Sequence, residues 1–157
     1  MQLGLTILLI THEMEVIRQI CDRVAVLDHG KKIEEGSALD IFMHPQHSIT
    51  KEFVATTMHS ELPEKWLQQL TQEAIGFPLL KLTFYGEAAL HPVIAQVTEA
   101  CGTALNIVQA HIGMIQDKPV GVTIVSLESV AVRDKVKSFL EQKGIFVEVL
   151  GYVSSIN

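Results

Sequence analysis

The fold is decided by residues 120–153, which read VGVTIVSLESVAVRDKVKSFLEQKGIFVEVLGYV. The apolar, β-branched run at residues 120–127 predicts a strand. Residues 129–143 predict a helix, because their apolar side chains recur at the spacing of one helical face, and Gly144 ends it. Residues 145–153 predict the last strand. The stretch is therefore one strand–helix–strand unit.

A second unit of the same kind comes before it. Residues 80–85 alternate apolar and polar side chains, which predicts a half-buried strand. Pro92 then begins a helix that Gly102 ends, and strand-like alternation resumes at residues 108–114. The order βαββαβ is that of the split-βαβ, ferredoxin-like fold, an antiparallel sheet with two helices on one face. We therefore predict an α+β fold whose C-terminal domain, residues 77–157, is ferredoxin-like.

The first part of the chain has a different pattern. The unbroken aliphatic run at residues 5–10 predicts a strand buried on both faces of a parallel sheet. A helix with Met14 and Cys21 on its apolar face and a strand at residues 24–27 are expected to follow, and then a short strand at residues 31–36. Because a parallel sheet needs further strands beside these, the segment is typical of the end of a larger α/β domain.

Two short helices are expected after these strands. Ser37 predicts the N-cap of a helix at residues 38–43, which Pro45 ends, and Ser48 predicts the cap of a helix at residues 49–55.

A polar, patternless stretch then separates two domains, residues 1–55 and 77–157. Residues 56–76 are expected to be a linker and a connecting helix that begins at Pro63 and ends at Gly76.

Composition excludes several classes of protein. With 12 basic against 18 acidic residues and a net charge of −6, no phosphate-tracking surface is expected, and we predict no nucleic-acid partner. The longest apolar run, residues 7–10, is far below the roughly 20 residues of a membrane span. Cys21 and Cys101 form no C-x-x-C pair, which favours reduced thiols in a cytoplasmic protein.

A metal site and hydrolase chemistry are not expected either. His44 and His47 lack a third ligand at a fixed spacing, and Pro45 breaks the helix that would align them. Residues 12–16, HEMEV, depart from the H-E-x-x-H metalloprotease pattern at its last position. No serine lies in a G-x-S-x-G elbow.

Residues 8–13, Leu-Leu-Ile-Thr-His-Glu, resemble the switch-histidine loop of ABC-transporter ATPases. Residues 21–36 and 40–45 resemble that family's closing strands and C-terminal helices, so residues 1–55 are identified as the C-terminal fragment of an ABC ATPase domain, a partial α/β segment. The resemblance implies that His12 is catalytic in an intact ATPase, where it hydrogen-bonds the γ-phosphate and poises the attacking water. The alternative is a histidine that satisfies local backbone at a helix start.

The rest of that family's machinery is missing from this sequence. No G-x-x-x-x-G-K-[ST] phosphate loop, no signature motif and no strand ending in Asp-Glu occurs in the 157 residues. We therefore expect no ATP hydrolysis and no cofactor for this chain alone. The resemblance implies ATP and Mg²⁺ as cofactors of the intact parent subunit only.

Residues 80–86 (LKLTFYG), 92–94 (PVI), 106–110 (NIVQA) and 147–153 (VEVLGYV) together resemble the NIL domain. That domain is the C-terminal regulatory module of methionine-import ABC ATPases. The resemblance implies a βαββαβ fold, a homodimer, and binding of methionine that inhibits transport when cytoplasmic methionine is high. It also implies a transmembrane permease as a partner, at the cytoplasmic face of the membrane.

Asn106 is the first candidate ligand-binding residue. It shares the strand parity of Val108, Ala110 and Ile112, so an amide with donors and an acceptor is expected on an otherwise apolar surface. The alternative is that Asn106 ends the strand and bonds nearby backbone. In the NIL family an asparagine at this place is implicated in methionine binding.

Three further residues are candidates for the same site. Gly86 and the helix start at Pro92 could offer N–H groups to a carboxylate, with plain turns as the alternative. Met114 is a candidate apolar contact, with core packing as the alternative. Two other functions stay open: a ligand-free dimerisation module, and part of a working transport ATPase.

Overall fold

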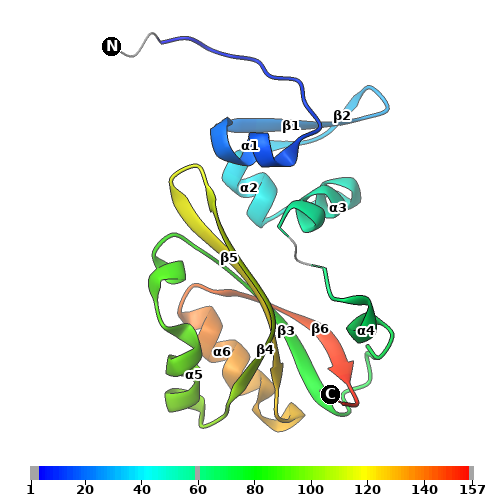
Figure 1. Ribbon diagram of the computed structural model, residues 1–157, viewed down its shortest axis with the longest axis vertical. Helices are drawn as coiled ribbons and strands as arrows, with labels where there is room; N and C mark the ends of the chain where they lie inside the picture. Colours follow the sequence, from blue (N-terminus) through cyan, green and yellow to red (C-terminus); the bar gives the residue numbers. More distant parts are fainter. Residues whose placement is uncertain (1–3, 59–60, 156–157) are drawn as a thin grey trace. The chain divides into compact units, whose positions relative to one another are not determined.

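The computed structural model describes residues 4–58 and 61–155. The chain divides into two compact units, residues 1–54 and residues 55–157, which are described separately below (Figure 1). Among the described residues, no helix has the length and apolar character needed to cross a membrane.

The first unit is built on a two-stranded antiparallel hairpin. His29 and Gly30 connect its strands with φ angles of 46° and 75°, as a two-residue type I′ turn requires. Buried Val24 and Val26 point to one side of the hairpin. The elements are α1 (Met14–Ile20), β1 (Arg23–Asp28), β2 (Lys31–Ser37), α2 (Ala38–Met43) and α3 (Ser48–Thr57), which runs into the second unit.

Helix α2 forms where the sequence predicts it. The Ser37 hydroxyl oxygen accepts a hydrogen bond from the Asp40 backbone N–H at 3.0 Å, which satisfies one of the free donors of the first turn. Ile41 and Phe42 are buried on its inner face.

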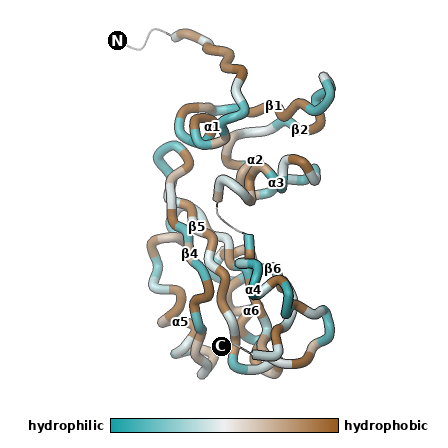
Figure 2. Tube along the Cα trace, turned by 45° about the vertical axis from the view of Figure 1, so that its right-hand side comes forward, coloured by the Kyte–Doolittle hydropathy of each residue, from teal (hydrophilic) through white to brown (hydrophobic). Residues whose placement is uncertain are grey.

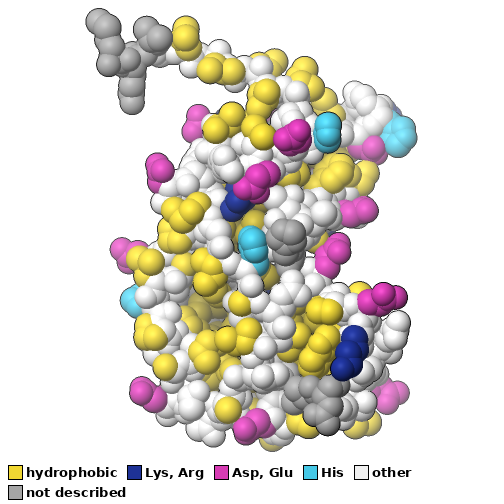
Figure 3. Space-filling view, in the orientation of Figure 1, with side chains coloured by type: hydrophobic (Ala, Val, Ile, Leu, Met, Phe, Trp, Pro, Cys, Tyr) yellow, Lys and Arg dark blue, Asp and Glu magenta, His cyan; other side chains and the backbone are white. Residues whose placement is uncertain are grey.

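The prediction of a strand at residues 5–10 is wrong. These residues lie in an extended segment outside any strand, and Leu8 and Ile10 are each 89% exposed. Figure 2 shows the segment as hydrophobic, and Figure 3 shows its apolar side chains uncovered. A strand needs a neighbour to bond with, and β1 takes β2 as its partner. No other strand of the described first unit is left to pair with the segment.

The second unit confirms the βαββαβ order. Its sheet has the strand order β4-β5-β3-β6 with every neighbouring pair antiparallel, which is the split-βαβ arrangement. The elements are α4 (Glu64–Leu67), β3 (Phe77–Tyr85), the 3₁₀ helix η1 (Gly86–Leu90), α5 (Val93–Cys101), β4 (Leu105–Ile115), β5 (Lys118–Leu127), the 3₁₀ helix η2 (Val130–Val132), α6 (Arg133–Gln142) and β6 (Phe146–Val153).

Helices α5 and α6 pack side by side on one face of this sheet (Figure 1). Val97 and Leu140 are fully buried against the strands, and Gly102 ends α5 with a φ of 68°. The core on this face consists of Leu80, Leu82, Val97, Cys101, Val125, Leu127, Val136, Leu140, Ile145 and Val147. We call the opposite side of the sheet the open face.

Residues 62–72, which we call the strap, cover part of the open face. Leu62 is buried, and Trp66 and Leu70 pack against the sheet residues Leu79, Ile124 and Val153. The predicted connecting helix up to Gly76 is too long, because α4 ends at Leu67. The chain beyond it pairs with β6 through an isolated bridge at Thr71 instead of continuing the helix.

Candidate functional site

Asn106 lies on β4 and faces the open side of the sheet. It pairs directly with Ser126 of β5, which pairs in turn with Leu79 of β3. Residues that are direct partners in neighbouring strands project from the same face. Since Leu79 packs against the strap, Asn106 and Ser126 lie on the same face as the strap.

A β-bulge corrects the predicted surroundings of Asn106. The pairing of β4 with β5 shifts between Ile107 and Gln109, so Val108 is an extra residue on β4. Beyond the bulge, Gln109 pairs with Ile124 on the open face, while Ala110 turns to the helix-covered face. Asn106 therefore shares its face with Val108, as predicted, but not with Ala110 and Ile112, because one extra residue reverses the alternation.

Sequence reasoning did not select Ser126 as a site residue. Its side chain is 1% exposed, and its hydroxyl is buried with no hydrogen-bond partner among the described residues. The signal in the sequence was a polar residue within an otherwise apolar strand. The residue of β4 that lies opposite Ser126 depends on the β4–β5 register, which includes a bulge and cannot be read from the sequence pattern.

The other candidates lie at the opposite end of the sheet. Gly86 directly follows the end of β3, Pro92 precedes α5, and Met114 pairs with Pro119 near the β4–β5 turn. Six residues of β3 separate the row of Asn106 from Tyr85, roughly 20 Å at about 3.3 Å per residue. Met114, 47% exposed, also lies on the helix-covered face. The structure does not bring these three residues to Asn106.

Gly86 and Pro92 both lie at chain turns. Gly86 has a φ of 60° with open space where a Cβ would be, and Pro92 is exposed at the start of α5. The Pro92 carbonyl accepts a bond from Gln96 N–H at 3.1 Å, as the first turn of a helix requires. Neither position has a polar side chain of its own to offer a ligand.

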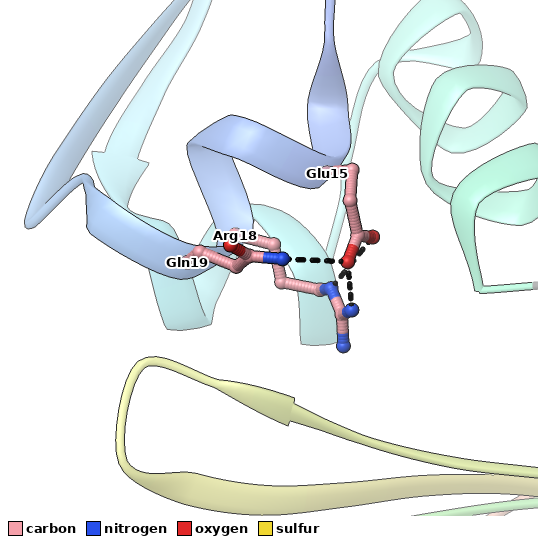
Figure 4. A network of polar contacts seen from close by, with 3 residues as sticks. All are labelled: Glu15, Arg18 and Gln19. Carbon is pink, nitrogen blue, oxygen red and sulfur yellow. Dashed lines mark hydrogen bonds and ion pairs between the residues drawn. The ribbon is translucent and has the colours of Figure 1, made fainter.

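His12 is exposed in the first unit, just before α1. Beside it, the Thr11 hydroxyl oxygen accepts a hydrogen bond from Glu13 N–H at 3.0 Å. The surface of α1 carries a small polar network, in which Arg18 and Gln19 both donate to the Glu15 carboxylate (Figure 4). The Gln19 bond is 3.0 Å long.

Glu34 organises the connection between α2 and α3. Its carboxylate accepts hydrogen bonds from the backbone N–H groups of Gln46 at 2.8 Å and His47 at 3.0 Å. Burial works to raise the pKa of Glu34, but the nearby Thr50 side chain, these backbone hydrogen bonds and the His47 ring outweigh it, so the pKa is lowered. We call this arrangement the Glu34 clasp.

The residues of this chain do not fit ATP with Mg²⁺. The sequence has no phosphate loop whose N–H groups and lysine would hold the phosphates. In the part of the chain that the structure describes, no three His, Cys, Asp or Glu side chains gather as a metal-binding group.

Comparison with known proteins identifies the family of the second unit. Residues 78–149 match the NIL domain model. The second unit carries a NIL domain. The match runs from the start of β3 into β6 and includes Asn106 and Ser126.

Similarity extends beyond the NIL domain to nearly the whole chain. The methionine import ATP-binding protein MetN of Rhodospirillum rubrum is 42% identical over 157 residues, covering 98% of this chain and 45% of that protein. The MetN protein of Pasteurella multocida is 41% identical over 155 residues, with 96% and 45% covered. The chain thus spans less than half the length of these curated relatives.

The chain is also similar to solved structures. One of them is the C-terminal domain of an ABC transporter ATP-binding protein from Enterococcus faecalis, at 24% identity and a TM-score of 0.44. The similarity covers 56% of this chain and 94% of that one.

Proposed function

We propose that this chain is the regulatory part of the ATP-binding subunit of a methionine importer, in which the NIL domain binds cytoplasmic methionine and inhibits transport. The observation that carries the proposal is the NIL match at residues 78–149 within a chain similar, over 98% of its length, to a methionine import ATP-binding protein. Such a subunit acts at the cytoplasmic face of the membrane, bound to a transmembrane permease.

The open face supplies what an amino acid needs. Asn106 offers an amide with both donors and an acceptor, and it is exposed, so a ligand can reach it. Val108 lies two residues further along β4, and Ile124 lies on the neighbouring strand β5. Their apolar side chains suit a thioether chain. Methionine would place its charged head group at Asn106 and its side chain toward this apolar cluster.

The partner of the NIL domain is a second copy of the same chain. Strand β4 is an edge of the sheet, and Ile107, Ile112 and Met114 on it are 51%, 67% and 47% exposed. An apolar edge strand of this length favours pairing with another chain. The same observation supports the alternative function, a dimerisation module that binds no ligand.

In the intact subunit, ATP and Mg²⁺ are the cofactors and His12 contacts the γ-phosphate. The support is the loop at residues 8–13 together with the similarity to ATP-binding proteins over nearly the whole chain. A histidine in this role orients the nucleophile and stabilises charge.

Isothermal titration calorimetry with methionine tests the proposal. Wild-type protein should release or absorb heat with a saturable curve, and Asn106→Ala should weaken binding roughly tenfold to over a hundredfold, because a charged group is left unpaired. Gln142→Ala, an exposed amide in α6, is the control and should bind like wild type.

A second readout separates a sensor from a scaffold. Neither heat nor a rise in melting temperature at millimolar methionine would show that the domain is a ligand-free dimerisation module. Sedimentation at the same concentrations reports the dimer independently of ligand.

A further inference from the structure

The hydroxyl of Ser126 is an unsatisfied polar group inside the NIL domain. It is buried at 1% exposure and has no hydrogen-bond partner among the described residues. Removing a hydroxyl from water without a replacement bond costs free energy, so native proteins avoid it except where the group has another use. The position of Ser126 indicates what that use is.

Ser126 stands in a row of residues that crosses the open face. The pairing register aligns Asn106 of β4, Ser126 of β5, Leu79 of β3 and Gly151 of β6. At one end of the row Asn106 is exposed to solvent. At the other end Gly151 lies under the strap, since a Cβ there would be 2.7 Å from the Thr71 carbonyl oxygen.

Ser126 is therefore the residue between the accessible amide and the covered half of the face. Its neighbour Leu79 packs with Leu62 of the strap, and Trp66 of the strap packs on the same apolar cluster. A ligand at Asn106 lies within one strand of Ser126, about 5 Å away.

We propose that Ser126 is the second polar contact for the amino acid bound at Asn106, and that the strap moves to admit the ligand. The proposal rests on the proposed function of the NIL domain. A serine hydroxyl donates one hydrogen bond and accepts others, so it can serve either the ammonium or the carboxylate of the ligand. Ligand binding would supply a hydrogen-bond partner for the unsatisfied Ser126 hydroxyl, which favours the bound state.

The test of Ser126 uses two measurements whose expected changes have opposite signs. In Ser126→Ala, methionine affinity by calorimetry should fall about tenfold, because one hydrogen bond to a charged group is lost. The melting temperature without ligand should not fall and should rise by up to about 5 °C, because a buried unpaired hydroxyl is removed. A purely structural role for Ser126 would lower stability and affinity together.

Two further variants test the role of the Ser126 hydroxyl. Ser126→Cys keeps the side-chain size with a weaker donor and should bind with intermediate affinity. Ser138→Ala, an exposed serine of α6, should change neither measurement. If wild-type protein binds methionine and Ser126→Ala binds equally well, the role of Ser126 is disproved while the proposed function stands. If wild-type protein does not bind methionine, both fall.

Trp66 reports on the strap. It is the single tryptophan of the chain, and it is partly buried on the open face. Its fluorescence should change with added methionine and saturate at the affinity that calorimetry gives. An unchanged fluorescence spectrum at a methionine concentration that saturates the calorimetric signal would disprove the proposed movement of the strap.

Discussion

Thr71 and Tyr152 exchange two backbone hydrogen bonds. The N–H of Thr71 donates to the Tyr152 carbonyl at 2.9 Å, and the N–H of Tyr152 donates to the Thr71 carbonyl at 2.8 Å. The Gln72 side chain adds a bond to the Leu150 carbonyl at 3.0 Å. These bonds fasten the end of the strap to β6, an edge strand of the sheet. The start of the strap, around Leu62 and Trp66, packs on the sheet through its apolar side chains.

Gly151→Ala should loosen this attachment. The new Cβ would lie 2.7 Å from the Thr71 carbonyl oxygen and 2.9 Å from Leu70 Cδ1, so the strap has to shift. We expect a loss of about 3 kcal/mol in the free energy of unfolding, measured by urea denaturation with Trp66 fluorescence. Gly144→Ala is the matched control, because Gly144 has a φ of 76° but open space around it, and it should cost about 1 kcal/mol. Equal losses would contradict the close packing of the strap on β6.

The proposed site should discriminate only modestly among apolar amino acids. An apolar pocket gains or loses about 1–3 kcal/mol for each methylene-sized change. Leucine and norleucine should therefore bind more weakly than methionine, by roughly tenfold to two-hundredfold, and still give measurable heats at high concentration. Binding of leucine as tight as that of methionine would show that the apolar cluster around Ile124 does not select the side chain.

The Glu34 clasp should make the first unit sensitive to acid. Because the pKa of Glu34 is lowered in the folded protein, its contribution to stability is present above the unfolded pKa of about 4.3. That contribution is lost as the pH falls through the folded pKa. Glu34→Gln should cost about 1 kcal/mol at pH 7, because two charge-assisted hydrogen bonds weaken.

Hydrogen exchange of the Gln46 and His47 amides measures this effect locally. The difference between wild type and Glu34→Gln should be constant near neutral pH and shrink below about pH 4. Glu99→Gln, an exposed carboxylate of α5, controls for the change in net charge and should leave both amides unaffected. A difference that persists unchanged at pH 3 would rule out the carboxylate as the source of protection.

The extended segment at residues 5–10 should exchange its amide hydrogens at the earliest time point of a hydrogen-exchange experiment. It lies outside any strand, and its large apolar side chains are exposed. The central strands β3 and β5 should be the last to exchange, because each is bonded on both sides and buried. Protection of residues 7–10 equal to that of residues 122–125 would contradict the structure of this segment.

His12→Ala should leave the stability of this chain unchanged, since the side chain is exposed. We expect no magnesium-dependent ATP hydrolysis from the purified chain, whether residue 12 is histidine or alanine. In an intact subunit the same substitution should reduce ATP turnover strongly, because the γ-phosphate loses its histidine contact. Magnesium-dependent turnover by the pure 157-residue chain would disprove the interpretation of the missing motifs.

Local chemistry is enough to predict several elements of the fold. Ser37 caps α2 through its own hydroxyl, and Gly102 ends α5 because glycine adopts a positive φ without a Cβ penalty. The order βαββαβ could also be predicted, because alternation and helical spacing are each read within one short segment. The resemblance to the NIL domain came from the residues of particular motifs, such as those at 80–86 and 147–153.

The surroundings of Asn106 depend on long-range strand pairing. The extra residue at Val108 reverses the alternation of β4, and the register of three strand pairs places Ser126 and Leu79 beside Asn106. The strap over the open face and the unpaired state of residues 5–10 likewise depend on which strand finds a partner. Pairing joins residues far apart in the chain, and its hydrogen bonds form between backbone groups that every residue carries, so local sequence patterns do not specify it.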